Sequence, residues 1–143
     1  MNTKPCVMDK LHTTNTAFVV DFEFPANIVL VTGDSGQGKS ACYSFIAEAA
    51  VLDPRIICYN YLNLNRDYAT EIRNSIGKLF VIDNADMLLN VELRKYICFD
   101  TKNQYLLFGR NPANLLATKH NLVELEKVVA EDRIIFNLKQ LFE

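Results

Sequence analysis

Gly33-Asp34-Ser35-Gly36-Gln37-Gly38-Lys39-Ser40 is the stretch that decides the fold of this chain. An apolar run, Asn27–Thr32, comes before it and predicts a buried strand. Residues 41–52 follow it and place their apolar side chains at helical spacing. The glycines allow backbone angles that a side chain would hinder. A strand, a glycine-rich loop and a helix therefore follow one another here.

This loop also has the composition of a phosphate-binding site, because it matches G-x-x-x-x-G-K-[ST] at every fixed position. Successive backbone N–H groups can form a concavity for anions, and the first turn of the next helix adds unpaired donors and a positive dipole end. Lys39 can reach the β- and γ-phosphates, and the Ser40 hydroxyl can ligate Mg²⁺. The alternative is an ordinary Gly/Ser turn, but average residue frequencies give the pattern by chance in well under roughly 1% of such chains.

The composition indicates one globular domain, which we expect to span residues 1–143. The formal net charge is −2, so no basic excess indicates nucleic acid as a partner. No apolar run is long enough to span a membrane, and the N-terminus lacks the apolar core of a signal peptide. The four cysteines form no C-x-x-C pair, which favours free thiols in a reducing cytoplasm.

Strands and helices alternate along the middle of the chain. We expect further strands at 55–61, 79–82 and 104–109, with helices at 67–76 and after Asn90. Asp67 and Asn90 are the expected N-caps of these helices. The alternation predicts an α/β fold with a mostly parallel sheet and helices on both faces. Residues 17–24 should form an N-terminal edge strand that pairs antiparallel with the strand before the loop.

The end of the chain breaks this alternation. Residues 122–129 and 133–138 are rich in apolar side chains and flank a polar turn at 130–132. They can form a β-hairpin, or a helix followed by a fifth strand. The β-branched residues in both runs favour the hairpin.

A second chemical motif lies at Leu79–Asp83, where a short apolar strand ends in a carboxylate. In open α/β sheets ligands bind at the carboxyl ends of the strands, where both this motif and the loop should lie. Asp83 could hold Mg²⁺ through the water shell of the ion. Many strands end in Asp for structural reasons, but the loop upstream favours the metal role.

The two motifs resemble the Walker A and Walker B segments of P-loop NTPases. The strand between them resembles the additional-strand division, which contains AAA-type, ABC-type and helicase-type ATPases. The resemblance implies a three-layer sandwich with core strand order 5-1-4-3-2, and ATP and Mg²⁺ as cofactors. It implies phosphate binding by Gly33, Asp34, Ser35, Gly36, Gln37, Gly38, Lys39 and Ser40, and metal binding by Ser40 and Asp83.

The residues that would act on the attacking water are less typical of this division. Asp83-Asn84-Ala85-Asp86 looks like a D-E-A-D box in which Asn84 replaces the glutamate. An amide can position water but cannot accept its proton, so hydrolysis is in more doubt than binding. Asp86 is the nearest replacement base, and its alternative role is that of an N-cap or a solvated turn residue.

Arg110 and Asn111 follow the strand expected at 104–109. The resemblance implies a polar sensor at this place, which Asn111 matches by type, and Arg110 could act as a charge-stabilising finger. The alternative is a simple turn at the end of the strand, with Arg110 paired to a surface acid.

These residues predict a minimal Mg-ATP-binding protein with weak or partner-stimulated ATPase activity, in which Lys39 compensates phosphate charge. A protein partner or a second copy of the chain would complete the site. The alternative is a nucleotide-dependent interaction or switch module with negligible hydrolysis, and Asn84 favours it. A small-molecule kinase is less favoured, because no acceptor pocket can be located. The preference for ATP over GTP rests on the resemblance and on the missing guanine-reading motif.

Overall fold

The structure is a computed structural model that describes residues 4–33, 38–111, 118 and 120–141. Its strands are β1 (Lys10–Thr14), β2 (Phe18–Glu23), β3 (Ile28–Thr32), β4 (Ile56–Tyr59), β5 (Leu79–Ile82), β6 (Gln104–Phe108), β7 (Leu122–Ala130) and β8 (Arg133–Gln140). Its helices are α1 (Lys39–Ala50), α2 (Tyr68–Asn74), α3 (Ala85–Leu88) and α4 (Val91–Phe99), with a 3-10 turn at Tyr61–Asn63.

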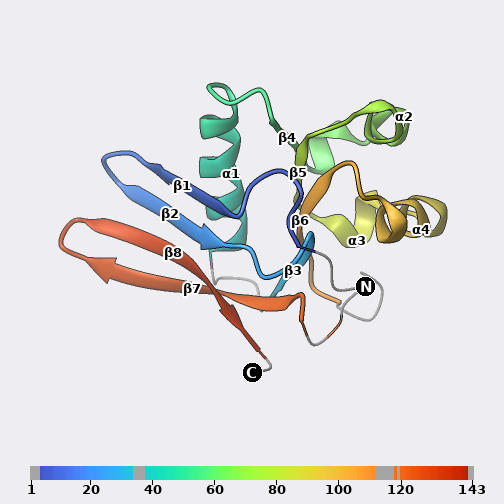
Figure 1. Ribbon diagram of the computed structural model, residues 1–143. Helices are drawn as coiled ribbons and strands as arrows, with labels where there is room; N and C mark the ends of the chain where they lie inside the picture. Colours follow the sequence, from blue (N-terminus) through green and yellow to red (C-terminus); the bar gives the residue numbers. More distant parts are fainter. Residues whose placement is uncertain (1–3, 34–37, 112–117, 119, 142–143) are drawn as a thin grey trace.

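The strands form one mixed, curled sheet in the order β1-β2-β8-β7-β3-β6-β5-β4 (Figure 1). Most neighbouring strands run parallel, including the whole series from β7 to β4. The antiparallel pairs are an N-terminal hairpin, β1–β2, and a C-terminal hairpin, β7–β8. The α/β class and the mostly parallel sheet predicted from the alternation of elements are confirmed.

The strands at the centre of the sheet are buried along their whole length. Every residue of β5 and β6 is buried, as is every residue of β3 except its two ends, which are partly exposed. Continuous apolar runs of this kind suit parallel strands that are covered on both faces. β3 lies between β6 and β7, so the segment that leads into the glycine-rich loop is held on both sides.

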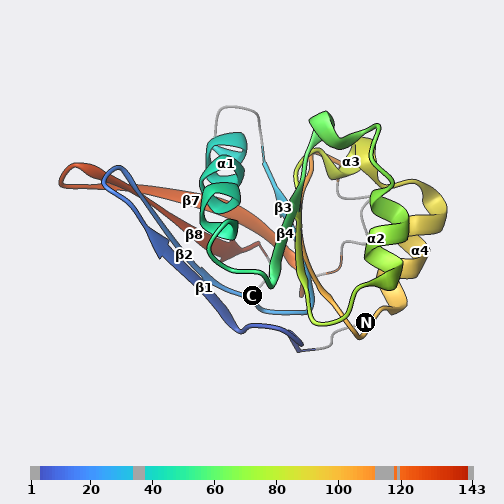
Figure 2. The same ribbon diagram turned by 90° about the horizontal axis from the view of Figure 1, so that it is seen from above.

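Helices cover both faces of the parallel part of the sheet (Figures 1 and 2). On one face α1 buries Cys42, Tyr43, Phe45 and Ile46 in a cluster that includes residues of β2, β3, β6 and β8. On the other face α2, α3 and α4 pack in a second cluster with alternate residues of β3, β5 and β6. In the described part of the chain no helix is long and apolar enough to cross a membrane.

Local hydrogen bonds fix where the shorter helices begin. The Asp67 carboxylate accepts a hydrogen bond from the N–H of Thr70 at 3.2 Å, and the Asn90 side chain accepts one from Leu93 at 2.8 Å. These are the two N-caps predicted from sequence, and each satisfies a first-turn donor that would otherwise lack a partner. α2 ends at Asn74, two residues earlier than expected.

The C-terminal hairpin is present, and its turn is tight. Ala130 pairs with Arg133, and Glu131 adopts a positive φ of 56° between them. The start of β7 also pairs in parallel with β3, where Leu30 lies opposite Leu122. The same element is therefore both the fifth parallel strand of the sheet and the first strand of the hairpin.

The partner expected for residues 17–24 is wrong. β2 pairs antiparallel with β1 and parallel with β8, where Val20 lies opposite Phe136, and both strands of the C-terminal hairpin separate it from β3. The hairpin occupies the edge of β3 that β2 was expected to take. The alternation of residues predicts that a segment is a strand, but it does not specify the strand's neighbour. β1 was not predicted, because Leu11 is its one buried residue.

The four cysteines are free thiols, as their spacing suggested. Cys42 is fully buried, whereas Cys6 is exposed. Burial raises the pKa of Cys58 to about 12. This thiol therefore stays protonated at neutral pH and is a poor nucleophile.

Candidate functional site

A pocket of about 610 Å³ lies where the carboxyl ends of β3, β5 and β6 meet the start of α1. Parallel strands deliver the residues that follow them to one edge of the sheet, which is where ligands bind in such folds. The residues that line it are Gly38, Lys39, Ser40, Ala41, Asp83, Asn84, Asp86, Met87, Phe108, Gly109 and Arg110. They come from three segments that lie far apart in the sequence.

This pocket brings together most of the predicted site residues that the structure describes. Those that line it are Gly38, Lys39, Ser40, Asp83, Asp86 and Arg110. Gly33 and Asn111 do not line it, but each forms a hydrogen bond with a residue that does. The remaining predicted phosphate-binding residues, Asp34, Ser35, Gly36 and Gln37, lie outside the described residues. The sequence did not single out Met87, Phe108 and Gly109, although the position of Gly109 after β6 places it at the same sheet edge.

The first turn of α1 is arranged differently from those of α2 and α4. Its N-cap is Gly38, at φ 91° and ψ 12°, which has no side chain to cap the helix. The first turn contains no acidic residue. Asp67 and Asn90 cap the other two helices with their side chains. The N-terminus of α1 therefore combines first-turn backbone donors that no N-cap side chain satisfies with the positive end of a 12-residue helix dipole, which favours an anion.

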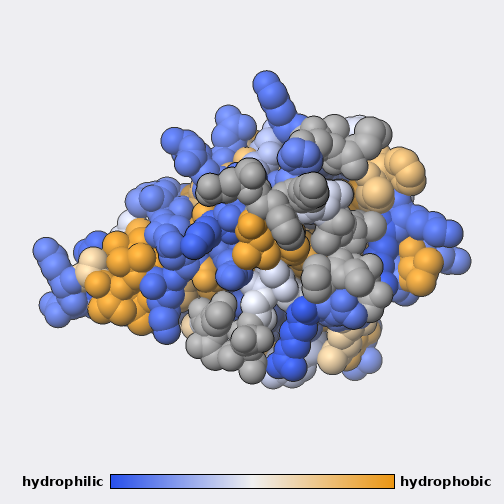
Figure 3. Space-filling model, turned by 90° about the horizontal axis from the view of Figure 1, so that it is seen from below, coloured by the Kyte–Doolittle hydropathy of each residue, from blue (hydrophilic) through white to orange (hydrophobic). Residues whose placement is uncertain are grey.

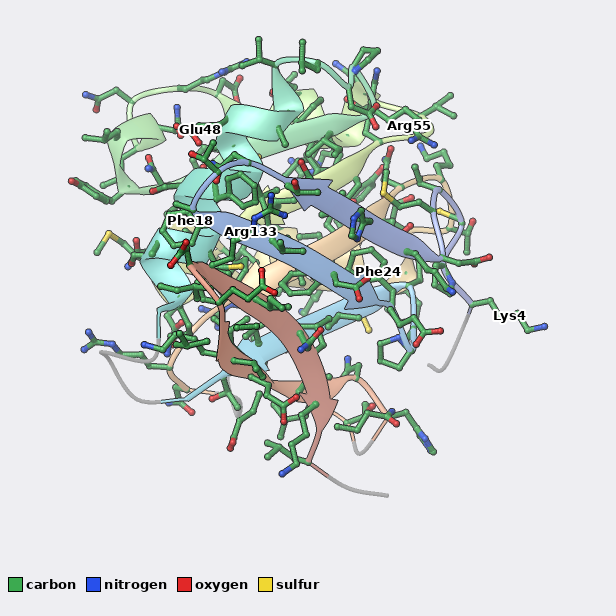
Figure 4. All side chains as sticks on the ribbon, turned by 90° about the vertical axis from the view of Figure 1, so that its left-hand side faces the viewer. Lys4, Phe18, Phe24, Glu48, Arg55 and Arg133 are labelled. Atoms are coloured by element: carbon green, nitrogen blue, oxygen red, sulfur yellow. The ribbon has the colours of Figure 1, made fainter. Side chains whose placement is uncertain are left out.

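The C-terminal hairpin leaves no room for a side chain at Gly38. A Cβ atom at this position would lie 3.0 Å from Cε1 of Phe136, a residue of β8. The Phe136 ring stacks on Phe18 at 5.9 Å, and Phe18 contacts Phe45 of α1 at 5.8 Å between ring centroids. Figure 4 shows Phe18 on β2 beside α1. The sequence marked Phe136 only as an apolar strand residue, and nothing in the pattern indicated its contact with the loop.

The Lys39 side chain is directed towards Gly33. Its ammonium group donates a hydrogen bond to the carbonyl oxygen of Gly33, at the other end of the loop. The backbone N–H of Cys42 donates to the carbonyl of Gly38 at 2.8 Å and closes the first turn of the helix. The cation is thus held beside Gly33, the first residue of the glycine-rich stretch.

Asp83 is buried, with 9% of its surface exposed, and its side chain accepts a hydrogen bond from the N–H of Asn84 at 3.0 Å. Burial raises the pKa of the Asp83 carboxyl group. The Asn84 N–H, the Lys39 ammonium and a hydrogen bond with Ser40 oppose this rise. Asp83 and Ser40 therefore lie side by side, although they come from different elements.

This pair of oxygen ligands fits Mg²⁺. Within the described ranges no three His, Cys, Asp or Glu side chains gather closely enough to form a complete metal site. Mg²⁺ does not require one, because it keeps several waters and binds through one or two protein oxygens together with substrate phosphates. Ser40 and Asp83 can supply these oxygens beside the loop.

Asp86 connects α3 with the end of β6. One carboxylate oxygen accepts a hydrogen bond from the backbone N–H of Arg110 at 3.1 Å, and the other accepts one from Asn111 at 3.0 Å. Its carbonyl oxygen accepts a hydrogen bond from the Arg94 guanidinium at 3.3 Å. α3 begins after Asn84, so Asp86 is not the N-cap of this helix. Its contacts give it a positioning role that the sequence did not indicate.

Asn84 and Arg110 present exposed side chains at the pocket. Asn84 adopts a left-handed conformation with φ 52°, which Asn tolerates better than most residues. Among the described residues Arg110 forms no ion pair, so the surface-acid alternative gains no support. Its charge is available to a ligand in the pocket.

No protein-family model matches this sequence, and no curated protein matches it. The functional assignment therefore depends on the pocket and on the residues that line it.

Replacing Gly38 by Ala tests the packing of the loop, and Gly77 provides a matched control. Both glycines have positive φ, but a Cβ at Gly77 meets nothing within 4 Å. Gly77→Ala should lower the free energy of unfolding by about 1–2 kcal/mol through backbone strain alone. Gly38→Ala should cost about 1–3 kcal/mol more, because the Phe136 ring must move. Urea denaturation measures both losses, and equal losses would contradict the proposed contact.

Two Asp→Asn substitutions separate a buried charge from a structural clamp. The pKa of Asp83 is higher in the folded than in the unfolded state. Ionisation of Asp83 therefore lowers the free energy of unfolding as the pH rises from the unfolded-state pKa to the folded-state pKa. At pH 7 Asp83→Asn should therefore leave the free energy of unfolding equal or higher, while keeping the acceptor for Asn84. Asp86→Asn replaces one acceptor oxygen by an NH₂ donor that faces a backbone N–H. This change should lower the free energy of unfolding by about 1–3 kcal/mol. Denaturation of both variants at pH 7 is the measurement, and a large loss of stability in Asp83→Asn would contradict this account.

Proposed function

We propose that this chain is a P-loop nucleotide-binding domain that binds Mg-ATP and is a weak or partner-stimulated ATPase. The observation that carries the proposal is the convergence of Lys39, Ser40 and Asp83 in one pocket at the start of α1. A cation, a hydroxyl group and a buried carboxylate meet there beside helix donors that no side chain caps. This set of groups matches the needs of a triphosphate with its magnesium ion.

The order of the strands supports the additional-strand division. From β7 to β4 the parallel strands follow the order β7-β3-β6-β5-β4. When these strands are numbered along the chain from the loop strand β3, the order becomes 5-1-4-3-2. β6 then separates the loop strand from the strand that ends in Asp83. Helices on both faces of this sheet support the three-layer arrangement that the resemblance implies.

Binding in this proposal depends on backbone and side-chain charge. The N–H groups of the loop and of the first turn of α1 hold the phosphates, and Lys39 compensates the β- and γ-phosphate charge. Ser40 and Asp83 hold Mg²⁺, which when bound neutralises charge that develops on the phosphate oxygens. Arg110 adds a second positive charge on the β6 side of the pocket. The protein thus works by positioning and electrostatic stabilisation.

The groups available to activate water are weak. Asn84 can orient a water molecule but cannot take its proton. Asp86 remains the nearest carboxylate, although its two oxygens already accept hydrogen bonds from Arg110 and Asn111. A protein partner or a second copy of the chain would supply the group that activates water. The chain would act in the cytoplasm. This arrangement favours slow hydrolysis by the isolated chain.

A second candidate is a nucleotide-dependent switch with negligible hydrolysis. The hydrogen bonds of Asp86 favour it, because they connect the pocket to the segment that follows β6. In this case the bound nucleotide changes the position of that segment, and hydrolysis has no role. A small-molecule kinase has the least support, and an acceptor panel in the phosphate-transfer assay tests it.

Lys39→Ala tests the central proposal. The variant should bind Mg-ATP about 100-fold more weakly, because it loses charge-assisted hydrogen bonds to phosphate. Lys95→Ala, which removes an exposed lysine on α4, should bind like the wild type. Isothermal titration calorimetry with and without Mg²⁺ measures both affinities, and Asp83→Ala should lose the dependence on Mg²⁺. Unchanged affinity in Lys39→Ala would overturn the proposal.

Substitution of Asn84 distinguishes the enzyme from the switch. Asn84→Glu places a carboxylate beside Asp83. Asn84→Gln is the control, because glutamine has the shape of glutamate without the charge and experiences the same backbone strain at this positive-φ position. If a general base is what the site lacks, Asn84→Glu should release phosphate about 10-fold faster or more, and Asn84→Gln should not. Equal phosphate release in both variants, with Mg-ATP still bound, would favour the switch.

A further inference from the structure

β7 carries a lysine where its sequence pattern calls for an apolar residue. Val123 and Leu125 point towards α1 and are buried in the cluster that contains α1. Successive side chains of a strand alternate between its faces, so the next residue on this face is Lys127. Its cross-strand neighbour, Phe136, is also buried on this face. A charged residue thus follows two core residues on the side of the sheet that holds the loop.

The aliphatic part of Lys127 lies close to Gly38. Its Cδ atom is 4.0 Å from the position that a Cβ of Gly38 would occupy, next to the Phe136 ring. The ammonium group lies two bonds further along the side chain, and Lys127 is exposed. Within the described residues it forms no ion pair. Val128 and Val129, which follow it, are exposed towards the end of the hairpin, where Figure 3 shows an apolar patch.

Lys127 and the pocket lie on opposite sides of Gly38. The pocket is bounded by residues that follow β5 and β6, and Lys127 does not line it. β6 and β7 pair with opposite edges of β3, so they flank the loop from two directions. Ser40 and Asp83 would hold Mg²⁺ in the pocket on the β6 side, and the β- and γ-phosphates would bind beside it. In that arrangement the other end of a triphosphate chain would extend towards the β7 side, the other edge of β3.

We propose that Lys127 is a phosphate-binding residue that contacts the α-phosphate, at the nucleoside end of the bound nucleotide. This inference rests on the proposed function and adds a binding group to it. The stem of Lys127 lies close to Gly38 and opposite Phe136, so a short reach brings its ammonium group to a phosphate beside Gly38. The negative net charge of the chain gives no general attraction for a nucleotide, so the placement of this charge matters.

Three variants of the full chain test the assignment. Lys127→Met keeps the aliphatic length and removes the charge, and Lys127→Arg keeps the charge. Lys139→Met makes the same change in charge on the other strand of the hairpin, where Lys139 is exposed and lies opposite Glu124. Titration calorimetry should give Lys127→Met an affinity about 10-fold lower for both Mg-ATP and Mg-ADP, because both contain the α-phosphate. Lys139→Met should match the wild type, and Lys127→Arg should recover most of the affinity.

The outcomes separate this inference from the proposed function. If the wild type binds Mg-ATP and Lys127→Met binds it equally well, the role of Lys127 is overturned and the proposed function stands. Equal weakening in Lys127→Met and Lys139→Met overturns it too, since the effect is then one of overall charge. A loss for Mg-ATP without a loss for Mg-ADP overturns the α-phosphate assignment. No binding of either nucleotide by the wild type overturns the proposed function and this inference together.

Discussion

The backbone at Gly38 is the constraint on which the rest of the site depends. The chain must leave β3, close a short loop and enter α1 within a few residues, and it does so through a positive φ at a residue that lacks a Cβ. The absence of a side chain at Gly38 has two structural consequences. It leaves the first turn of α1 without a side-chain cap, and it lets the Phe136 ring approach. The helix that would bind the anion is thus positioned by a strand near the end of the chain.

The pocket contains one carboxylate that stabilises the folded state, Asp86, and one whose charge destabilises it, Asp83. Asp86 accepts two backbone hydrogen bonds and holds the segment after β6, which is a favourable use of a carboxylate. Asp83 is buried, and its raised pKa shows that its charge is held against a desolvation penalty. A buried carboxylate with a raised pKa and a nearby cation, in a pocket, is a candidate for a functional site. The contrast between these two carboxylates, three residues apart, is therefore an argument for a binding site at Asp83.

Local interactions explain how much of the fold and the site could be predicted from the sequence. The caps at Asp67 and Asn90 depend on hydrogen bonds within three residues, and the strands β5 and β6 on continuous apolar runs. The grouping of Lys39, Ser40 and Asp83 followed from one rule, that parallel strands end at the same sheet edge.

The features that could not be predicted from the sequence depend on contacts between distant segments of the chain. The pairing of β2 with β8 joins segments near opposite ends of the chain, and residue alternation does not specify which strands become neighbours. The bonds of Asp86 go to backbone N–H groups, which every non-proline residue has, so no residue pattern marks them. The contact of Phe136 with Gly38 depends in turn on the unpredicted position of the hairpin. Each of these features joins segments that are distant in sequence.

The hairpin gives the two sides of the site different mechanical support. On the β5–β6 side, strands are covered by helices on both faces, and the carboxylates are fixed to buried elements. On the β7 side, Phe136 and Lys127 of the hairpin lie close to Gly38, and the outer end of the hairpin carries exposed valines. A phosphate chain held by Lys39 and Lys127 together would join the two sides through charge. Binding would then tie the hairpin to α1 more tightly than packing does alone, which is the kind of differential contact that a nucleotide-dependent switch requires.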